Sequence, residues 1–372
     1  MRIAAIDIFP LRLPFREEFR IARGSVGNPT DGAPHLYVRI RTESGHEGWG
    51  EARPSHRWSY ETEESVLASL RRYLAPALIG ADVWELRELH ERMDRELAPG
   101  ISVGAPIAKC ALDMAAHDLL ACSAGVPLHR FLGGAAEEIR LSFLISVADP
   151  ESAGERAAAA WGAGFRAMKV KIGSGLEHDL ELLRAVRTAA PAAYLWADAN
   201  QAYDSAGARL LARRMEPLAV DCLEQPIPAN DWLGLARLTT QSPVPIGVDE
   251  SVFSAGDLLQ LIRLGAGEIL VVKLSKMAGV GPALECIRLA RTAGMRILGS
   301  GLTETRLGLA ATAHVLAAGG GCDYADLNGP QFLAEDPVAG GVDVSGGAVR
   351  LSHSAGIGVV LDEEKLHRFS VS

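Results

Sequence analysis

The chain has 372 residues, of which 48% are hydrophobic and 22% are charged, and its net charge is −9. This acidic balance argues against a nucleic-acid-binding protein, and no apolar stretch reaches the length of a membrane span. The five cysteines form no close pair and no CxxC motif, which is typical of reduced thiols and predicts a cytoplasmic protein.

Residues 1–130 are predicted to form one α+β unit. The runs AAIDIFPLRLPF and HLYVRIRTESGHEGWGEA have strand patterns, with SGHEG as a turn, and the first of them lacks the continuous apolar core of a signal peptide. Helices are expected near 62–77, 83–98 and 104–123. The stretch at about 15–32 is rich in Gly, Pro and Asn, which predicts a long mobile loop.

From about residue 139 onward, short β-rich runs alternate with helical segments, as in a parallel sheet with crossover helices. Eight runs are predicted to be strands: RLSFLISV, RAMKVKIG, YLWADANQ, VDCLEQP, VPIGVDES, EILVVKLSK, RILGSGL and CDYADLN. The predicted fold class is therefore α/β, with a (β/α)₈ TIM-type barrel over 131–340. The tail, 341–372, contains the strand-like run GVDVSGGAVRLS and is expected to return to the N-terminal unit.

One ionisable side chain lies near the end of each of five consecutive predicted strands. These residues follow one another at intervals of 24 to 27 residues, which matches one β/α unit: Lys171, Asp198, Glu224, Asp249 and Lys273. Catalytic residues of such barrels lie at the carboxyl ends of the strands, so all five are expected at one mouth.

The three carboxylates would repel one another in a low-dielectric barrel unless a cation compensates them. They are hard oxygen donors with no His or Cys beside them, which favours Mg²⁺, with Mn²⁺ as a substitute. The alternative is a network of salt bridges with Lys or Arg inside the barrel.

Lys169 and Lys171 lie two apart in one strand and should share its inward face. A second ammonium, a divalent metal and partial desolvation are expected to lower the lysine pKa, so that a neutral amine is available as a base. Lys171 is the better candidate, tuned by Lys169, and Lys273 lies across the barrel. A substrate between two amines could lose a proton on one face and regain it on the other.

These residues resemble the enolase superfamily and, within it, the muconate lactonizing enzyme subgroup. The resemblance covers nearly the whole chain and rests on five motifs in order: KVK at 169–171, DAN at 198–200, EQP at 224–226, DES at 249–251 and KLSK at 273–276. It implies an N-terminal capping domain, Mg²⁺ and an enediolate made by removing the proton α to a carboxylate. It also implies Asp198, Glu224 and Asp249 as metal ligands and Lys171 and Lys273 as the acid/base pair. The run RILGSGL has no His at its end, which separates this chain from mandelate racemase-type enzymes.

The resemblance also suggests residues that contact the substrate. ADLNGP is similar to the pattern of dipeptide epimerases, in which two aspartates two residues apart hold an α-ammonium group. Here the first is Asp326, and Asn328 stands in place of the second. Glu304 resembles the acid that lines the pocket in related epimerases and racemases, and the alternative is a carboxylate at a helix N-terminus after Thr303. Ser146 is a further candidate. Asn200 and Glu250 are expected to support the metal ligands. Specificity is expected from two capping loops, about 15–32 and 51–60, whose charged residues Arg20, Arg23, His56 and Arg57 could each meet a distal carboxylate or be solvated loop charges.

The leading hypothesis is a Mg²⁺-dependent racemase or epimerase that acts on a dipeptide or an N-acylamino acid. The same chemistry leaves a muconate-type cycloisomerase or a hydroxy-acid dehydratase open, and a catalytically silent metal-binding protein is the alternative from another class. A small carboxylate is the expected partner, with no nucleic acid and no membrane. Relatives suggest a homo-oligomer, either a dimer or an octamer.

Overall fold

The structure is a computed structural model that describes residues 1–100 and 103–371. It begins with a three-stranded antiparallel sheet in the order β1-β4-β5, formed by β1 (Ile3–Leu13), β4 (Ala33–Thr42) and β5 (Glu47–Ala52). Along β4 the inward side chains, such as Leu36, Val38 and Ile40, are buried, as expected when one face of a sheet packs on a core. The helices that follow this sheet confirm the predicted α+β character of this part.

Short helices follow this sheet: α1 (Glu63–Ala68), the π-helical turn η1 (Ser69–Leu74), α2 (Ala75–Leu78), α3 (Leu86–Glu96), α4 (Pro106–Ser123) and α5 (Leu128–Phe131). A capping box of Thr62 and Ser65 starts α1. The helix α4 is buried nearly all round because β5 covers it closely. This approach needs glycine: a Cβ at Gly50 would lie 2.0 Å from the Ala111 carbonyl oxygen, and one at Gly48 2.3 Å from that of Ala115.

The stretch at 15–32 is not the structureless loop that its composition predicts. It contains a hairpin of β2 (Phe19–Ile21) and β3 (Gly24–Gly27). Two buried side chains, Phe19 and Ile21, flank Arg20 and hold this hairpin against the barrel mouth. The sequence pattern did not reveal these strands because each is shorter than five residues and glycines interrupt the alternation of apolar and polar residues.

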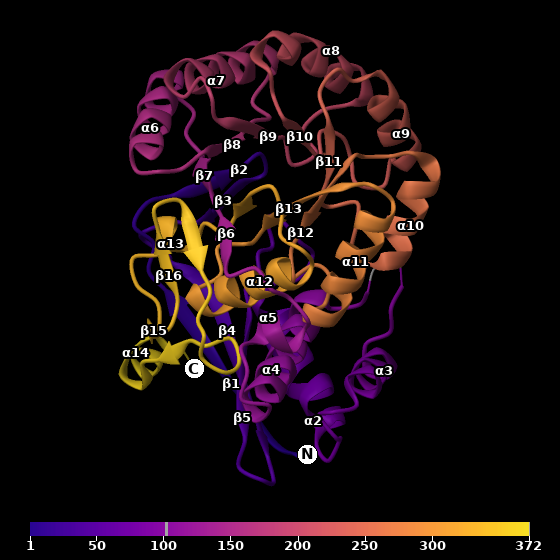
Figure 1. The fold of residues 1–372 in the computed structure, drawn as a ribbon, viewed down its shortest axis with the longest axis vertical. Helices are drawn as coiled ribbons and strands as arrows, with labels where there is room; N and C mark the ends of the chain where they lie inside the picture. The colour runs from indigo at the N-terminus through magenta and orange to yellow at the C-terminus, as the bar shows by residue number, and fades with distance from the viewer. Residues whose placement is uncertain (101–102, 372) are drawn as a thin grey trace.

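A parallel sheet of eight strands forms the barrel, and all eight predicted strands are present (Figure 1). They follow one another in chain order: β7 (Ser142–Ile145), β8 (Ala167–Lys171), β9 (Tyr194–Asp198), β10 (Cys222–Glu224), β11 (Ile246–Val248), β12 (Ile269–Val272), β13 (Arg296–Ser300) and β14 (Ala325–Asp326). A parallel bridge from Leu141 to Ala325 closes the sheet. The predicted TIM-type barrel is thus confirmed.

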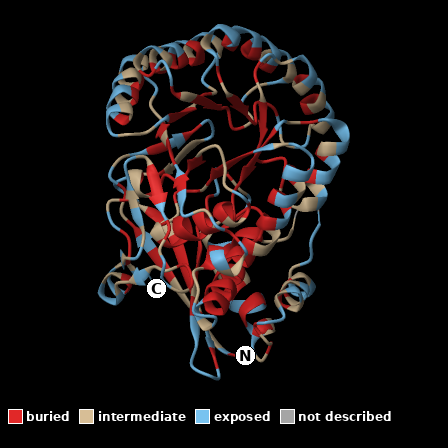
Figure 2. Cartoon of the chain, viewed as in Figure 1, coloured by how far each residue is buried: buried red, intermediate tan, exposed pale blue. Residues whose placement is uncertain are grey.

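Crossover helices surround the barrel: α6 (Pro150–Gly162), α7 (Leu176–Ala189), α8 (Ser205–Met215), the 3₁₀ turn η2 (Glu216–Leu218), α9 (Trp232–Gln241), α10 (Ala255–Leu264), α11 (Val280–Thr292), α12 (Arg306–Ala318) and α13 (Gly329–Phe332). Side-chain caps begin most of them, including Asp149, Asp204 and Ser254. Figure 2 shows that the strands are buried and that the outer faces of α6 to α10 are exposed. No helix among the described residues is long and apolar enough to cross a membrane.

The C-terminal tail takes two paths. The predicted strand-like run forms the hairpin β16 (Asp343–Ser345) and β17 (Ala348–Arg350), which pairs with β6 (Glu138–Arg140) before the barrel and not with the N-terminal sheet. A second pair joins β15 (Val338–Gly340) to β18 (Val360–Leu361), and α14 (Glu363–Phe369) packs on β1.

After α14, Val371 donates a backbone hydrogen bond to the Pro10 carbonyl oxygen, 2.9 Å long, and Ser370 forms a bridge with Leu11. The last residue, 372, lies outside the described residues. The end of the tail thus reaches the N-terminal sheet, whereas its hairpin stays at the start of the barrel.

Two buried carboxylates join the N-terminal domain to the barrel. Asp113 of α4 accepts hydrogen bonds from the backbone N–H groups of Val280 and Gly281 at the start of α11, with N–O distances of 2.5 and 3.3 Å. Glu51 of β5 accepts hydrogen bonds from the backbone N–H groups of Thr305 and Gly308 at the start of α12, with both N–O distances 2.9 Å. Negative charge is favourable at a helix N-terminus, so each contact stabilises a helix and the domain interface at once.

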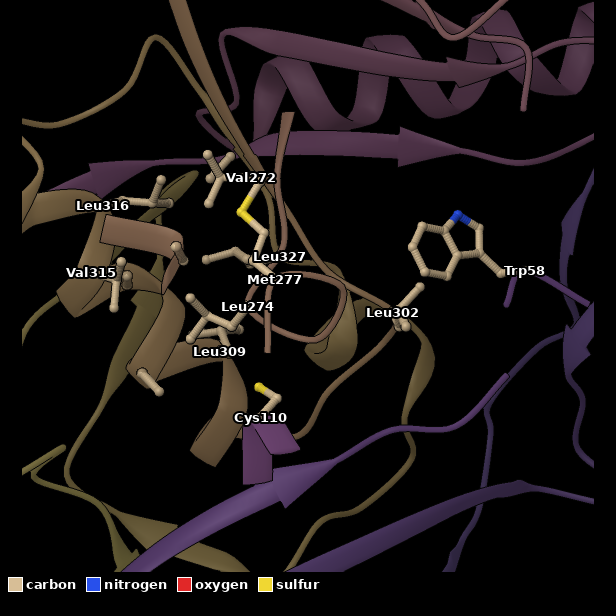
Figure 3. Packing of buried hydrophobic residues seen from close by; sticks show 14 of the residues in the cluster. Trp58, Cys110, Val272, Leu274, Met277, Leu302, Leu309, Val315, Leu316 and Leu327 are labelled. Atoms are coloured by element: carbon tan, nitrogen blue, oxygen red, sulfur yellow. The ribbon is translucent and has the colours of Figure 1, made fainter. Parts of the chain in front are cut away.

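The hydrophobic core continues across this interface. Figure 3 shows Cys110 of α4 near Leu309 of α12 and Leu274, with Met277 and Leu327 beyond them. The N-terminal domain therefore packs directly under the loops that carry the barrel mouth.

Candidate active site

Strand register brings the charged residues together. In the parallel sheet, Lys171 lies beside Asp198 and Asp198 beside Glu224, while Glu224 neighbours Gly247, two residues before Asp249. Neighbours in register share one face of a sheet, so these side chains enter the same end of the barrel. Asp198, Glu224 and Asp249 are fully buried there.

The backbone after two of these strands is left-handed, which turns the chain sharply at the mouth. Asn200 has a φ of 41° and Gln225 a φ of 37°. The Gln225 side chain then accepts from the N–H groups of Asp249 and Ser251, at 3.0 and 3.2 Å. Gln225 was not predicted as a site residue, although it is the second residue of the quoted EQP motif.

Lys169 is the centre of the acidic cluster. Its Nζ lies 3.1 Å from Asp198 Oδ2, 3.0 Å from Glu224 Oε2 and 3.2 Å from Asp326 Oδ2. The same ammonium lies 4.1 Å from the ring centroid of Trp196, its neighbour in β9. Lys169 thus joins acids from three strands.

Lys171 and Lys273 hold different acids. Lys171 donates to Asp198 Oδ2 at 2.6 Å and to Asn200 Oδ1 at 3.0 Å. Lys273 forms a short contact with Asp249 Oδ2. Both amines line one cavity, as predicted from the strand pattern.

A fourth lysine, Lys276, was overlooked by sequence reasoning. Its Nζ lies 2.8 Å from Asp249 Oδ1 and 2.5 Å from the Asp249 carbonyl oxygen. The signal was the second lysine of KLSK, which lies on the loop just after β12 and folds back on the same aspartate.

The expected lowering of the lysine pKa does not hold for two of these amines. Burial lowers the pKa of Lys169, but Glu224, Asp198 and Asp326 raise it more, so its pKa lies well above the usual value. Burial likewise lowers the pKa of Lys273, and the facing Asp249 outweighs it. Attraction to the acids exceeds the repulsion between ammonium groups because the acids are closer and more numerous.

The carboxylates respond in opposite directions. Burial and the neighbouring Asp198 raise the pKa of Glu224 well above its usual value. Burial also opposes ionisation of Asp249, but Lys273 and Lys276 lower its pKa below the usual range. Of the three expected metal ligands, Glu224 is thus the one whose charge is least compensated.

A hard cation fits this cluster. Among the described residues, no three His, Cys, Asp or Glu side chains form a ready-made metal cage, because ammonium groups lie between the acids. Both oxygens of Glu224 are nevertheless buried without a hydrogen bond, although Oε2 faces Lys169. A divalent ion would compensate that carboxylate, and Asp198, Glu224 and Asp249 offer it oxygen donors from three adjacent strands.

Glu250 and Asn200 form a buried pair behind the acids. The Asn200 Nδ2 group donates to Glu250 Oε1 at 3.1 Å, and the backbone N–H of Asn200 donates to Asp198 Oδ1 at 3.0 Å. Burial and the neighbouring Asp249 raise the pKa of Glu250. The pair therefore orients Asp198, in keeping with the supporting role expected of it.

Two unpaired acceptors also lie at this cavity. Asp326 Oδ1 and Asn328 Oδ1 are buried and have no hydrogen-bond donor among the described residues. Both residues line the cavity that also contains Lys171 and Lys273. A buried acceptor without a donor is costly, so a ligand that brings a donor would be favoured here.

The two capping loops close the cavity with mostly apolar side chains. Phe19, Ile21 and Val26 come from the first loop, and Ser55 and Trp58 from the second. The four charged loop candidates, Arg20, Arg23, His56 and Arg57, do not line this cavity.

Two other predicted substrate contacts lie outside the cavity. Ser146 donates to the Arg20 carbonyl oxygen at 2.6 Å and so ties the first barrel strand to the β2–β3 hairpin. Glu304 accepts from the Leu302 N–H at 2.6 Å, and burial raises its pKa to about 7. Neither side chain lines the cavity that contains Lys171 and Lys273.

Comparison with known proteins gives the family. The model "Enolase C-terminal domain-like" matches residues 152–365, and the model "Mandelate racemase / muconate lactonizing enzyme, N-terminal domain" matches residues 5–133. The chain belongs to the mandelate racemase/muconate lactonizing enzyme family. The resemblance to the enolase superfamily stated from the five motifs is therefore confirmed.

Characterised members of this family match along the whole chain. An aromatic dipeptide epimerase from Herpetosiphon aurantiacus is 36% identical, covering 96% of this chain and 99% of its own. The crystal structure of a dipeptide epimerase from Enterococcus faecalis, with Mg and the dipeptide L-Leu-L-Tyr, is 31% identical with a TM-score of 0.90, covering 96% of this chain and 99% of its own.

The crystal structure of an N-succinyl Arg/Lys racemase from Bacillus cereus is 28% identical with a TM-score of 0.94, covering all of this chain and 99% of its own. These relatives confirm the predicted enzyme class, an isomerase of the racemase or epimerase type. Mg²⁺ occurs with neighbouring members of the family.

Proposed function

We propose that the protein is a Mg²⁺-dependent dipeptide epimerase, which inverts the α-carbon next to the free carboxylate. The observation that carries this proposal is one cavity lined by Lys171, Lys273 and the unpaired acceptors of Asp326 and Asn328. A dipeptide brings an α-ammonium group with three N–H donors, which suits two oxygen acceptors in the same cavity. Asn328 in place of a second aspartate removes a charge but keeps an acceptor oxygen.

Asp198, Glu224 and Asp249 would hold the Mg²⁺ ion, and Mn²⁺ would substitute for it. When bound, the ion would offset the negative charge that grows on the substrate carboxylate. Lys171 and Lys273 approach the α-carbon from opposite sides. One amine takes the α-proton and the other ammonium delivers a proton to the opposite face, which inverts the configuration. Asn200 and Lys169 keep Asp198 in place beside Lys171.

Replacement of either catalytic lysine tests this assignment. Lys171→Ala and Lys273→Ala should each lower the rate of inversion by about 10²–10⁴-fold, since one face then lacks its proton carrier. The measurement is proton NMR in D₂O with a dipeptide library, which reports α-deuterium incorporation and inversion together. Lys365→Ala, on the surface helix α14, is the matched control. Full activity in Lys171→Ala would refute the assigned role.

An N-acylamino acid racemase is the second candidate, favoured by the relative with an N-succinyl substrate. Both kinds of substrate have an amide N–H beside the reacting carbon, but an N-acylamino acid lacks the ammonium group of the dipeptide's amino-terminal residue and so offers fewer donors to the two acceptors. For this reason the dipeptide is preferred. A cycloisomerase or dehydratase would change the absorbance of a conjugated double bond without inversion.

We also propose a cytoplasmic homo-oligomer. All five cysteines are free, which suits a reducing compartment. Size-exclusion chromatography with light scattering measures the number of subunits directly.

A further inference from the structure

Gln225 links the ends of three barrel strands. It follows β10 directly and is fully buried. Its backbone N–H donates to the Gly247 carbonyl oxygen in β11 at 2.9 Å, and its own carbonyl oxygen accepts from the Gln201 N–H in the loop after β9 at 2.7 Å. The expected metal ligands lie at the ends of the same three strands. Gln225 is therefore placed to control how these ligands lie relative to one another.

The side-chain amide of Gln225 uses all of its hydrogen-bonding capacity. Its oxygen accepts from the backbone N–H groups of Asp249 and Ser251 at 3.0 and 3.2 Å. Its Nε2 group donates to the Ile227 carbonyl oxygen at 3.1 Å and to Ser251 Oγ at 2.9 Å. An amide has two donor hydrogens and two acceptor lone pairs, so every one of them is engaged. A buried polar group that is fully satisfied makes the backbone around it rigid.

The backbone of Gln225 is strained. Its φ of 37° lies in the left-handed region, where glycine is the default residue. Strained backbone persists only where surrounding contacts hold it, and here the amide itself makes four of these contacts. A glycine would remove the strain and all four bonds together.

The two neighbouring metal ligands depend on these bonds. Among the described residues neither oxygen of Glu224 has a hydrogen-bond partner, so apart from its ion pair with Lys169 this carboxylate is placed by its backbone. The next residue in that backbone is Gln225, and its amide holds the backbone of Asp249. The amide thus fixes the spacing of Glu224 and Asp249 without adding charge. It does not line the cavity that contains Lys171 and Lys273.

We infer that Gln225 is a positioning residue that makes the metal site selective for a small divalent ion. This inference rests on the proposed function, which assigns Glu224 and Asp249 to the ion. Mg²⁺ requires nearly ideal octahedral geometry with oxygens at about 2.0–2.1 Å, whereas Ca²⁺ accepts flexible arrangements at about 2.3–2.6 Å. A rigid spacing of the two carboxylates therefore favours Mg²⁺ over Ca²⁺.

Calorimetric titration of the full-length, metal-free protein with MgCl₂ and with CaCl₂ tests the inference. Gln225→Met keeps an unbranched side chain of similar length but loses the four amide hydrogen bonds. The Mg²⁺ affinity should fall by about 10–100-fold, which is typical when a residue that orients metal ligands is replaced, and the Ca²⁺ affinity should fall less. The ratio of the two affinities should therefore drop. An unchanged ratio would overturn the inference.

Gln331→Met is the matched control. The Gln331 amide also bonds a backbone, at the N–H and the carbonyl oxygen of Leu144, but on β7, which carries no expected metal ligand. Its Mg²⁺ and Ca²⁺ affinities should equal those of the wild type, so that a general loss of packing is separated from a change at the site. If Gln225→Met does not fold, Ser251→Ala decides, because it removes one acceptor of the Gln225 amide. A lower ratio in Ser251→Ala would support the inference, and an unchanged ratio would overturn it.

Inversion of dipeptides judges the proposed function separately. A wild-type protein that binds Mg²⁺ but inverts no dipeptide would refute the epimerase, while a drop of the affinity ratio in Gln225→Met would still support the role of Gln225. A wild-type protein that inverts dipeptides but binds Ca²⁺ more tightly than Mg²⁺ would overturn the inference alone. Binding of neither ion would overturn both.

Discussion

At the scale of single residues, the site is defined by a surplus of buried acid. Five buried acids converge on four lysines: Asp198, Glu224, Asp249, Glu250 and Asp326. Within the part of the chain that the structure describes, the oxygens of Glu224 have no hydrogen-bond partner. Buried charges of this kind are tolerated in the barrel interior only while opposite charges lie close to them. The cluster can therefore accommodate a cation, and removal of any one of its charges should destabilise the site.

Magnesium should stabilise the fold through Glu224. At about 100 times its dissociation constant, an ion that binds only the native state adds about 2.7 kcal/mol to the free energy of unfolding. Thermal melts with MgCl₂ and with EDTA measure this effect. In Glu224→Gln the shift between the two conditions should shrink strongly. A wild-type melting temperature that is the same with MgCl₂ and with EDTA would contradict a metal site at Glu224.

Asp326 should discriminate between substrates by their nitrogen. Asp326→Asn should lower kcat/KM for a dipeptide by about ten- to a hundredfold, since the acceptor facing the ammonium group then carries no charge. An N-succinylamino acid carries no such charge and serves as the control substrate. Equal losses with both substrates would indicate a role in holding Lys169 instead.

Sequence reasoning found the acids and the two facing lysines because their spacing equals one β/α repeat. It did not find the direction of the lysine pKa shifts, which depends on distances of about 3 Å across strands. Nor did it find Trp58, Gln225 or Lys276. Their partners lie on other loops, and no periodic pattern marks such contacts.

At the scale of secondary-structure elements, β5 packs closely on α4. Gly48 and Gly50 let the strand lie directly on the helix backbone. This contact fixes the position of Glu51, which caps α12 from the other side of the strand. A local requirement for glycine thus determines how the N-terminal domain sits on the barrel.

Gly50→Ala should destabilise the protein by about 1–3 kcal/mol, because its Cβ would meet the Ala111 carbonyl oxygen. Urea unfolding followed by circular dichroism measures the change. Gly162→Ala is a suitable control, since no atom lies within 4 Å of a Cβ at that position in α6. Equal stability of the two variants would show that β5 can move away from the helix at little cost.

Longer and more deeply buried elements were easier to predict from the sequence than short ones. The barrel strand β12 is a continuous apolar run between helices, so its pattern is strong. The hairpin of β2 and β3 has only three and four residues and was predicted as loop. The β16–β17 hairpin was recognised as strand, but its partner β6 lies some 200 residues earlier, and pattern alone does not reveal pairing over such a separation.

At the scale of the whole molecule, the two domains are joined by a charge cluster around Asp113. Its carboxylate lies 2.7 Å from His90 Nε2 and 3.3 Å from His117 Nδ1, and it caps α11 of the barrel. Burial opposes the charge of each group, but mutual attraction lowers the pKa of Asp113 and raises the pKa of His90 and His117. Domain docking is therefore linked to pH.

The histidines, whose pKa is raised, stabilise the fold fully below their unfolded pKa of about 6.5 and lose that contribution as the pH rises through their folded pKa. Wild-type protein should thus lose stability between about pH 6 and pH 9 more steeply than Asp113→Asn. The variant should also be about 2–4 kcal/mol less stable at pH 6. Urea unfolding at both pH values tests this, and parallel pH profiles would refute it.

The outer edge of β1 is covered by the last residues of the chain, through Ser370 and Val371. These contacts join residues that lie some 360 positions apart in the sequence. Without them this part of the β1 edge would be open, and open strand edges recruit other chains. Removal of α14 and the residues after it should therefore favour aggregation before it affects chemistry at the barrel mouth.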